Sequence, residues 1–261
     1  MQENSFKFFT LNYWRSIDKK ILFCFLILFF LGLFFSFSST SSLAGERLNK
    51  DYYFFFTKHL IFTILAISIM MIISFIRTEV LIKLVIPAFV VSFIFLSIVP
   101  IIGVEAKGAR RWLNLYFFNL QPVEILKPLF ILMTVKILTY ENFQNYHVKY
   151  FLIFILLSCV IILLIDQPDL GQSILLTSSW IATVFVSGVS LIYIGIFLAI
   201  FLILFSSLLF FLPEKFGYII NRLISFFDPS QGDKFQSSAA LDAIKLGGLT
   251  GQGMGEGILK E

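Results

Sequence analysis

The stretch that decides the fold of this chain reads Lys107-Gly-Ala-Arg-Arg-Trp-Leu-Asn-Leu115 and, after a short gap, Gln121-Pro-Val-Glu-Ile-Leu-Lys127. Its first part is a short basic segment between two long apolar runs. Its second part carries a glutamate and a lysine into the next apolar run. Charged side chains at membrane depth are costly, so they are rarely kept without a function. The stretch therefore indicates a membrane fold and the place of a site within it.

The composition of the whole chain supports a membrane protein. Of 261 residues, 58% are hydrophobic, 14% are charged and 34 are phenylalanine, and the mean hydropathy is +0.92. A water-soluble domain of this length does not need so much apolar surface. The formal net charge of +4 is too small to indicate a nucleic-acid partner. Cys24 and Cys159 both lie inside apolar runs, which predicts packing in a helix rather than redox chemistry.

The apolar runs predict seven membrane-spanning helices, because one crossing needs about 20 apolar residues. We expect them at 21–38, 54–76, 80–101, 122–140, 150–165 and, as two helices, within 170–213. Ser187-Gly-Val-Ser190 is the natural turn between the last two. The predicted fold is an all-α polytopic bundle over 21–213. Residues 1–20 form its cytoplasmic N-terminus, and 214–261 form an incomplete periplasmic loop that can contain short helices.

Basic residues before the first apolar run predict that the N-terminus is cytoplasmic, and no cleavable signal peptide is evident. The loop at 140–149 is then inside, whereas the loop at 102–121, the turn at 166–171 and the tail are outside. The outer loop at 102–121 is itself basic. This exception is either a chance violation of the positive-inside rule or a sign that the loop binds an anion such as a lipid phosphate.

The fourth predicted helix begins with two charges on one face. Pro122 suits the first helical position, and Glu124 falls in the first turn, where the helix dipole favours an anion. Glu124 and Lys127 are three residues apart and therefore neighbours on the helix surface. They form either a simple ion pair at the membrane interface or a charged pair that faces a cavity in the bundle. If the helix continues through Pro128, the carbonyl of Glu124 loses its donor.

A second polar insertion, Asp166-Gln-Pro-Asp-Leu-Gly171, follows the fifth predicted helix. Its two carboxylates suit turn and helix-cap chemistry, which alone could account for them. The glycine-rich run at 247–257 follows no apolar strand and opens no helix, which disfavours a nucleotide-binding loop. A tightly turning loop near a substrate is the better interpretation.

Taken together, these motifs resemble the SEDS family (FtsW, RodA and SpoVE), the polytopic glycosyltransferases of bacterial cell-wall synthesis. The matching pieces are Gly108-Ala-Arg-Arg-Trp-Leu113, Gln121-Pro-Val-Glu-Ile-Leu-Lys127, Gln167-Pro-Asp-Leu-Gly171 and the glycine-rich run, in the family's order. The segments at 227–236 and 255–260 look more like the division type, FtsW, than the elongation type, RodA. The resemblance implies that seven of the family's usual ten transmembrane helices lie in this sequence.

The resemblance also implies an activity, the polymerisation of lipid II with inversion at the anomeric carbon and loss of undecaprenyl pyrophosphate. Arg111, helped by Lys107 and Arg110, would then bind the pyrophosphate, since arginine forms bidentate hydrogen bonds with phosphates. Lys127 would face the catalytic carboxylate. The remaining expected site residues are Glu124 and Gln121, which would shape the same cavity, Asp169, which would orient its loop, and Trp112 and Gln236 as substrate contacts.

The family's catalytic aspartate is expected in a His-Thr-Asp motif after the glycine-rich run, and no such motif occurs before Glu261. No residue here is therefore given its role, and we expect these 261 residues alone not to polymerise lipid II. A divalent cation, Mg²⁺ or Mn²⁺, is implied by the resemblance, although the sequence shows no ligand set for one. The implied partners are a class B penicillin-binding protein transpeptidase and other division proteins, in the bacterial inner membrane.

Three other functions are alternatives to an enzyme. A lipid II flippase or other lipid transporter would need polar residues along a path to both faces, whereas the charges cluster at one end of the fourth predicted helix. An ion-coupled transporter would show inverted repeats, and the two halves show none. A non-catalytic membrane scaffold for division proteins is the strongest of the alternatives.

Overall fold

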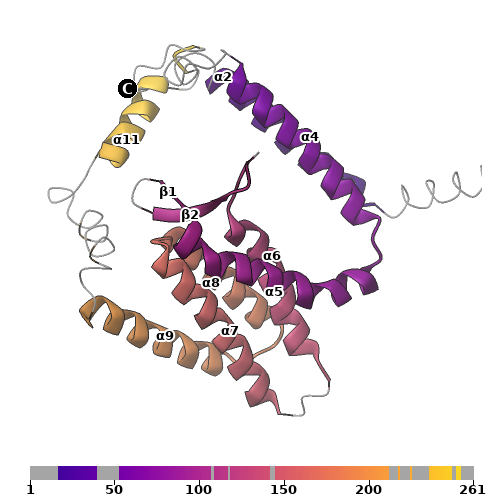
Figure 1. Ribbon diagram of the computed structural model, residues 1–261, viewed down its shortest axis with the longest axis vertical. Helices are drawn as coiled ribbons and strands as arrows, with labels where there is room; N and C mark the ends of the chain where they lie inside the picture. Colours follow the sequence, from indigo (N-terminus) through magenta and orange to yellow (C-terminus); the bar gives the residue numbers. More distant parts are fainter. Residues whose placement is uncertain are drawn as a thin grey trace, which may run out of the picture. The chain divides into compact units, whose positions relative to one another are not determined.

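A computed structural model of the chain describes residues 17–39, 53–106, 109–116, 118–141, 145–211, 217, 224, 235–248 and 251–253. The chain divides into two compact units. One unit is formed by Met1–Ile76 with Ile219–Glu261, and the other by Arg77–Tyr218. Figure 1 labels the helices of both units and the strands β1 and β2.

The first unit contains α2 (Lys19–Ser39), α4 (Phe54–Ser74) and α11 (Phe235–Gly247). The carboxylate of Asp18 caps α2, since Oδ1 accepts hydrogen bonds from the backbone N–H of Lys20 at 2.9 Å and of Ile21 at 3.2 Å. α2 packs against α4. α11 lies in the tail that was expected to be a loop containing short helices.

The second unit contains five helices: α5 (Thr78–Ile102), α6 (Pro122–Thr139), α7 (Tyr146–Asp166), α8 (Leu170–Val186) and α9 (Leu191–Phe211). α6 contacts α5, α7 and α8, and α9 packs on α7 and α8. Apolar residues three or four apart form one buried face on each central helix. These residues include Leu96 and Val99 on α5, Leu126 and Phe130 on α6, Ile153, Leu157 and Ile161 on α7, and Leu176, Trp180 and Val184 on α8.

The seven expected segments are all helical in the part of the chain that the structure describes. Four of the helices, α2, α4, α5 and α7, are long and apolar enough to cross a membrane. Shorter apolar stretches cover α8 and the Leu191–Ser207 part of α9. α6 carries Glu124, Lys127 and Lys136 within its 18 residues. The all-α membrane fold is confirmed, whereas the number of crossings stays a prediction.

The loop at 102–121 is more regular than the sequence predicts. It forms a small antiparallel sheet of β1 (Val104–Ala106), β2 (Ala109–Asn114) and β3 (Asn119–Leu120), in that order. β2 contacts both α5 and α6. Figure 1 shows β1 and β2 near the C-terminal end of α5 and the N-terminal end of α6. Strands of two to six residues are too short to leave a clear alternating pattern, so they could not be predicted from the sequence.

The turn between α8 and α9 lies at the predicted place. The N–H of Gly188 donates to Phe185 O at 3.1 Å and the N–H of Val189 donates to Val184 O at 3.4 Å. This pattern is a Schellman motif, in which the residue after the C-cap adopts a left-handed conformation. Gly188 does so with φ +82°, which a glycine accepts without steric cost.

Candidate functional site

The beginning of α6 carries the first part of the site. Gln121 is the N-cap and Pro122 the first helical residue. Lys127 Nζ lies 2.7 Å from Glu124 Oε2, so the two residues form the ion pair expected from their spacing. The Lys127 side chain is 20% exposed and that of Glu124 is 50% exposed. α6 continues through Pro128, which removes the N–H that would have bonded the carbonyl of Glu124.

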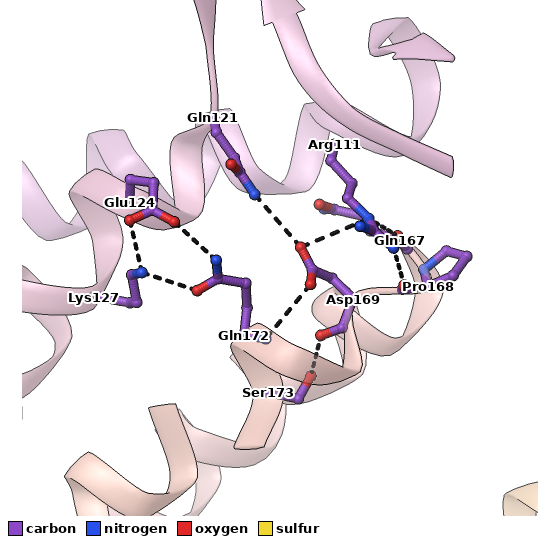
Figure 2. A network of polar contacts seen from close by, with 9 residues as sticks. All are labelled: Arg111, Gln121, Glu124, Lys127, Gln167, Pro168, Asp169, Gln172 and Ser173. Atoms are coloured by element: carbon purple, nitrogen blue, oxygen red, sulfur yellow. Dashed lines mark hydrogen bonds and ion pairs between the residues drawn. The ribbon is translucent and has the colours of Figure 1, made fainter. Parts of the chain in front are cut away.

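Gln172 on α8 connects both members of this ion pair to the second helix. Lys127 Nζ donates to Gln172 Oε1 at 2.9 Å, and Gln172 Nε2 donates to Glu124 Oε1 at 2.9 Å. The three side chains thus form a closed triangle, which Figure 2 shows between the two helices. The pair is therefore neither isolated at the surface nor confined to one helix. It faces α8.

Gln172 was missed in the analysis of the sequence, although a signal for it exists. Asp169-Leu-Gly-Gln172 has the spacing of a capping box, in which an acidic or amide residue stands at the third helical position. The side chain of Gln172 points across to α6 instead of back to its own N-cap. Local sequence rules identify the position but not the partner, because the partner lies 45 residues away.

Asp169 has two roles that the sequence left as alternatives. It is the N-cap of α8, and its Oδ1 accepts from the N–H of Gln172 at 3.5 Å. Its Oδ2 lies 3.7 Å from Arg111 Nε and accepts from Gln121 Nε2 at 3.5 Å. The side chain is only 10% exposed. Asp169 therefore caps its helix and also joins β2, α6 and α8 in one network (Figure 2).

Arg111 is held mainly by the turn between α7 and α8. Its Nε donates to Gln167 O at 3.2 Å, and its Nη2 donates to Pro168 O. Within the described part of the chain, Nη1 has no partner. The side chain is 31% exposed. A guanidinium in this position is fixed on one side and keeps a donor group on the other.

Arg110 and Trp112 lie on the opposite face of β2 from Arg111. Exposure alternates along the strand, and Arg110, Trp112 and Asn114 are the exposed set. Arg110 Nη2 lies 3.5 Å from Glu105 Oε2, and Nη1 donates to Pro100 O at 3.4 Å. The two arginines, which were expected to act together, thus point in different directions.

Two expected site residues cannot be placed beside this network. Lys107 lies outside the described residues. Gln236 belongs to α11 in the other compact unit, and its side chain is also outside the description. The residues that the structure does bring together are Arg111, Gln121, Glu124, Lys127 and Asp169, joined by Gln167 and Gln172.

The network holds two cations and two carboxylates, so its formal charges balance. Glu124 and Asp169 each have a cationic partner, at 2.7 Å and 3.7 Å respectively. Among the described residues, no group of three or more histidine, cysteine, aspartate or glutamate side chains could hold a metal ion. No role is therefore assigned to a divalent cation.

The fold and this network define a class, a helical multi-pass membrane protein with a charged site where α6 and α8 begin. The family model for FtsW, RodA and SpoVE, described as "Cell cycle protein", matches residues 18–260. The chain belongs to this family, which confirms the resemblance inferred from its motifs. Together with the apolar helices, this membership identifies a multi-pass protein of the inner membrane.

Similar proteins from other bacteria carry an enzyme name. The chain is 32% identical over 258 residues to "Probable peptidoglycan glycosyltransferase FtsW" of Caulobacter vibrioides, covering 95% of this chain and 63% of the relative. It is 30% identical to the protein of the same name from Haemophilus influenzae, covering 93% and 62%. The chain thus spans about three-fifths of the length of these relatives.

Two solved structures share the fold. A chain in the structure of a peptidoglycan synthase complex superposes with a TM-score of 0.69 and 24% identity, covering 90% of this chain and 67% of that one. A mutant of the rod shape determining protein RodA of Thermus thermophilus superposes with a TM-score of 0.56 and 24% identity, covering 67% and 55%. These likenesses confirm the SEDS-type arrangement of the helices.

Proposed function

We propose that this protein is a lipid II-polymerising peptidoglycan glycosyltransferase of cell division. The proposal is supported by family membership and by relatives that are named peptidoglycan glycosyltransferases. The observation that carries it is the joint network of Arg111 and Lys127, two partly buried cations tied together through Asp169 and Gln172. A cationic site between helix ends suits the pyrophosphate of a lipid-linked sugar.

In the proposed reaction, a hydroxyl group of one disaccharide attacks the anomeric carbon of another. The bond from that carbon to the pyrophosphate oxygen breaks, and the negative charge develops on the leaving pyrophosphate. The Lys127 ammonium has three N–H donors and two acceptors among the described residues, which leaves one for a phosphate oxygen. The Nη1 group of Arg111 can likewise donate a hydrogen bond to a phosphate oxygen. We assign the general base to none of the described residues.

We expect the substrate phosphate to displace the Glu124 carboxylate from Lys127. The Glu124 side chain is half exposed, so it can turn to solvent when a phosphate takes its place beside Lys127. Asp169 is 10% exposed and caps α8, and it therefore stays in place. In this proposal the network faces the periplasm, the N-terminus is cytoplasmic, and a class B penicillin-binding protein transpeptidase is the partner. The fold likeness to a chain from a peptidoglycan synthase complex supports that partner.

Binding of lipid II tests the proposal directly. The purified chain in lipid nanodiscs is titrated with fluorescent lipid II, and Arg111→Ala and Lys127→Ala are compared with the unmodified protein. We expect each change to weaken binding about tenfold or more, because a hydrogen bond to a charged group contributes about 1.5–3 kcal/mol. Lys136→Ala is the matched control, since it removes a lysine from the other end of α6, where Nζ donates to Ile82 O at 2.7 Å.

The proposal would be overturned if Arg111→Ala and Lys127→Ala bound lipid II as tightly as the Lys136→Ala control. Absence of binding by the unmodified protein would also overturn it. The same variants separate the rival functions. Made in a protein that spans the full length of the relatives, Arg111→Ala or Lys127→Ala abolishes lipid II polymerisation by an enzyme, which still purifies with its transpeptidase partner. A scaffold keeps the partner and shows no dependence on either residue. A flippase moves lipid II across a vesicle membrane without forming glycan.

A further inference from the structure

Pro100 leaves one backbone carbonyl of α5 without its helical donor. The proline lies inside α5 and has no N–H, so the carbonyl of Leu96, four residues earlier, cannot form the usual helix hydrogen bond. Leu96 is fully buried. A buried carbonyl without a donor is unfavourable, so another group is needed at this point.

Gln167, the C-cap of α7, supplies the missing donor. Its Nε2 donates to Leu96 O at 3.0 Å, between residues 71 positions apart in the sequence. Gln167 is 2% exposed, which is unusual for an amide side chain and is explained by this bond. Through it, the turn that follows α7 is attached to α5.

The backbone of the same residue holds Arg111. Gln167 O accepts from Arg111 Nε at 3.2 Å, and the next carbonyl, that of Pro168, accepts from Nη2. The side chain of Gln167 thus donates a hydrogen bond to α5, and its backbone carbonyl accepts one from the Arg111 guanidinium. A shift of the turn away from α5 would move two of the acceptors that fix Arg111.

We infer that Gln167 is a positioning residue, which ties the α7–α8 turn to the carbonyl that Pro100 leaves open in α5 and so holds Arg111 for the substrate phosphate. Only the statement that Arg111 is held for the substrate phosphate rests on the proposed function. The attachment of the turn to α5 is a structural statement and has its own test.

The first experiment is a double-mutant cycle on stability, measured as apparent Tm of the purified chain in detergent. Gln167→Met keeps the length of the side chain and removes the donor, so we expect a fall of about 3–8 °C. Pro100→Ala restores an N–H for Leu96 O within α5. In that background the same Gln167→Met change should lower the Tm by less than half as much. Equal losses in both backgrounds would show that the two residues are not coupled and would overturn the inference.

The second experiment separates positioning from stability. In the Gln167→Met, Pro100→Ala double variant, the stability should return while the affinity for fluorescent lipid II stays at least about threefold weaker, which is about half of the tenfold loss expected for Arg111→Ala on a logarithmic scale. Adding Arg111→Ala to Gln167→Met should cause no further loss beyond that of Arg111→Ala alone. Return of affinity together with stability would reduce Gln167 to a structural role and contradict the inference.

Hydrogen exchange of the turn provides a readout that does not need lipid II. The N–H of Asp169 donates to Leu164 O at 3.0 Å and that of Ser173 donates to Asp169 O at 3.2 Å. Both should exchange faster in the double variant, even though its Tm is restored. Ser92→Ala is the control: it removes a buried hydrogen bond from Ser92 Oγ to Ala88 O at 2.9 Å within α5 and should leave the exchange of the turn unchanged. Unchanged hydrogen exchange of the turn in the double variant would overturn the inference. If exchange is faster in the double variant but the unmodified protein does not bind lipid II, only the proposed function is refuted.

Discussion

At the scale of single residues, Asp169 shows how one carboxylate can serve two elements. Its Oδ1 caps α8 and its Oδ2 faces Arg111 and Gln121. A helix N-terminus stabilises a negative charge, and so does the neighbouring guanidinium. The two interactions support each other, because the cap fixes the side chain in the orientation that Arg111 requires.

Replacement of Asp169 can separate these two interactions. Asp169→Asn keeps an oxygen for the helix cap and loses the charge, whereas Asp169→Ala loses both. We expect Asp169→Ala to lower the free energy of unfolding by about 1 kcal/mol more than Asp169→Asn does, which is the usual contribution of an N-cap. Denaturant unfolding of the purified protein in detergent measures the difference. Equal losses would mean that the cap contributes nothing here.

At the scale of elements, the end of α8 is determined by a local backbone signal. Gly188 adopts φ +82° in the Schellman turn, and Val189 after it is buried, as is Val184 on the last turn of the helix. Apolar residues at these two positions commonly accompany the motif. The turn therefore reverses the chain and at the same time adds to the packing of α9 on α8.

Two glycine substitutions test the turn, with one serving as the control of the other. A Cβ added at Gly188 or at Gly195 would meet no atom within 4 Å, so neither change is opposed by crowding. Gly188→Ala must hold an alanine at positive φ, and we expect a loss of about 1 kcal/mol. Gly195→Ala lies inside α9 and should be neutral or stabilising by up to about 1 kcal/mol. Thermal unfolding of both variants measures the contrast, and a similar loss for both would contradict it.

At the scale of the whole molecule, orientation in the membrane is the property that connects the network to its proposed substrate. The network lies where α6 and α8 begin, so both helices must start on the same side. The basic residues before α2 predict that this side is the periplasm. The proposed lipid II polymerisation requires that side, because the glycan is assembled outside the membrane.

Cysteine labelling tests the orientation. In a background with Cys24→Ala and Cys159→Ala, Glu105→Cys on β1 and Glu141→Cys after α6 are exposed to a membrane-impermeant maleimide in spheroplasts of an expression host. We expect Glu105→Cys to react in intact spheroplasts and Glu141→Cys to react only after permeabilisation. The reverse pattern would place the network in the cytoplasm and would also rule out its role in periplasmic polymerisation.

Much of the fold could be predicted because it depends on local composition. Long apolar runs indicate helices wherever they occur, and the Ser187–Gly188 turn and the start of α6 at Pro122 follow from local backbone preferences. The ion pair of Glu124 and Lys127 also follows from spacing alone, since residues three apart meet on any helix.

The parts of the site that could not be predicted depend on contacts between distant segments. The pleat of β2 sends Arg110 and Arg111 to opposite faces, and the sequence had suggested one basic cluster. Packing of α8 on α6 brings Gln172 to the ion pair, and packing of α7 on α5 brings Gln167 to the open carbonyl of Leu96.

The amino-acid sequence therefore carries the helices, the turn and the charged residues of the site, because each of these is set by neighbours along the chain. The contacts between different helices are set by the fold, since the residues that form them lie 45 to 71 positions apart and meet only when the helices pack. A hydrogen bond requires both groups at about 3 Å, and no local pattern encodes a distance between two helices.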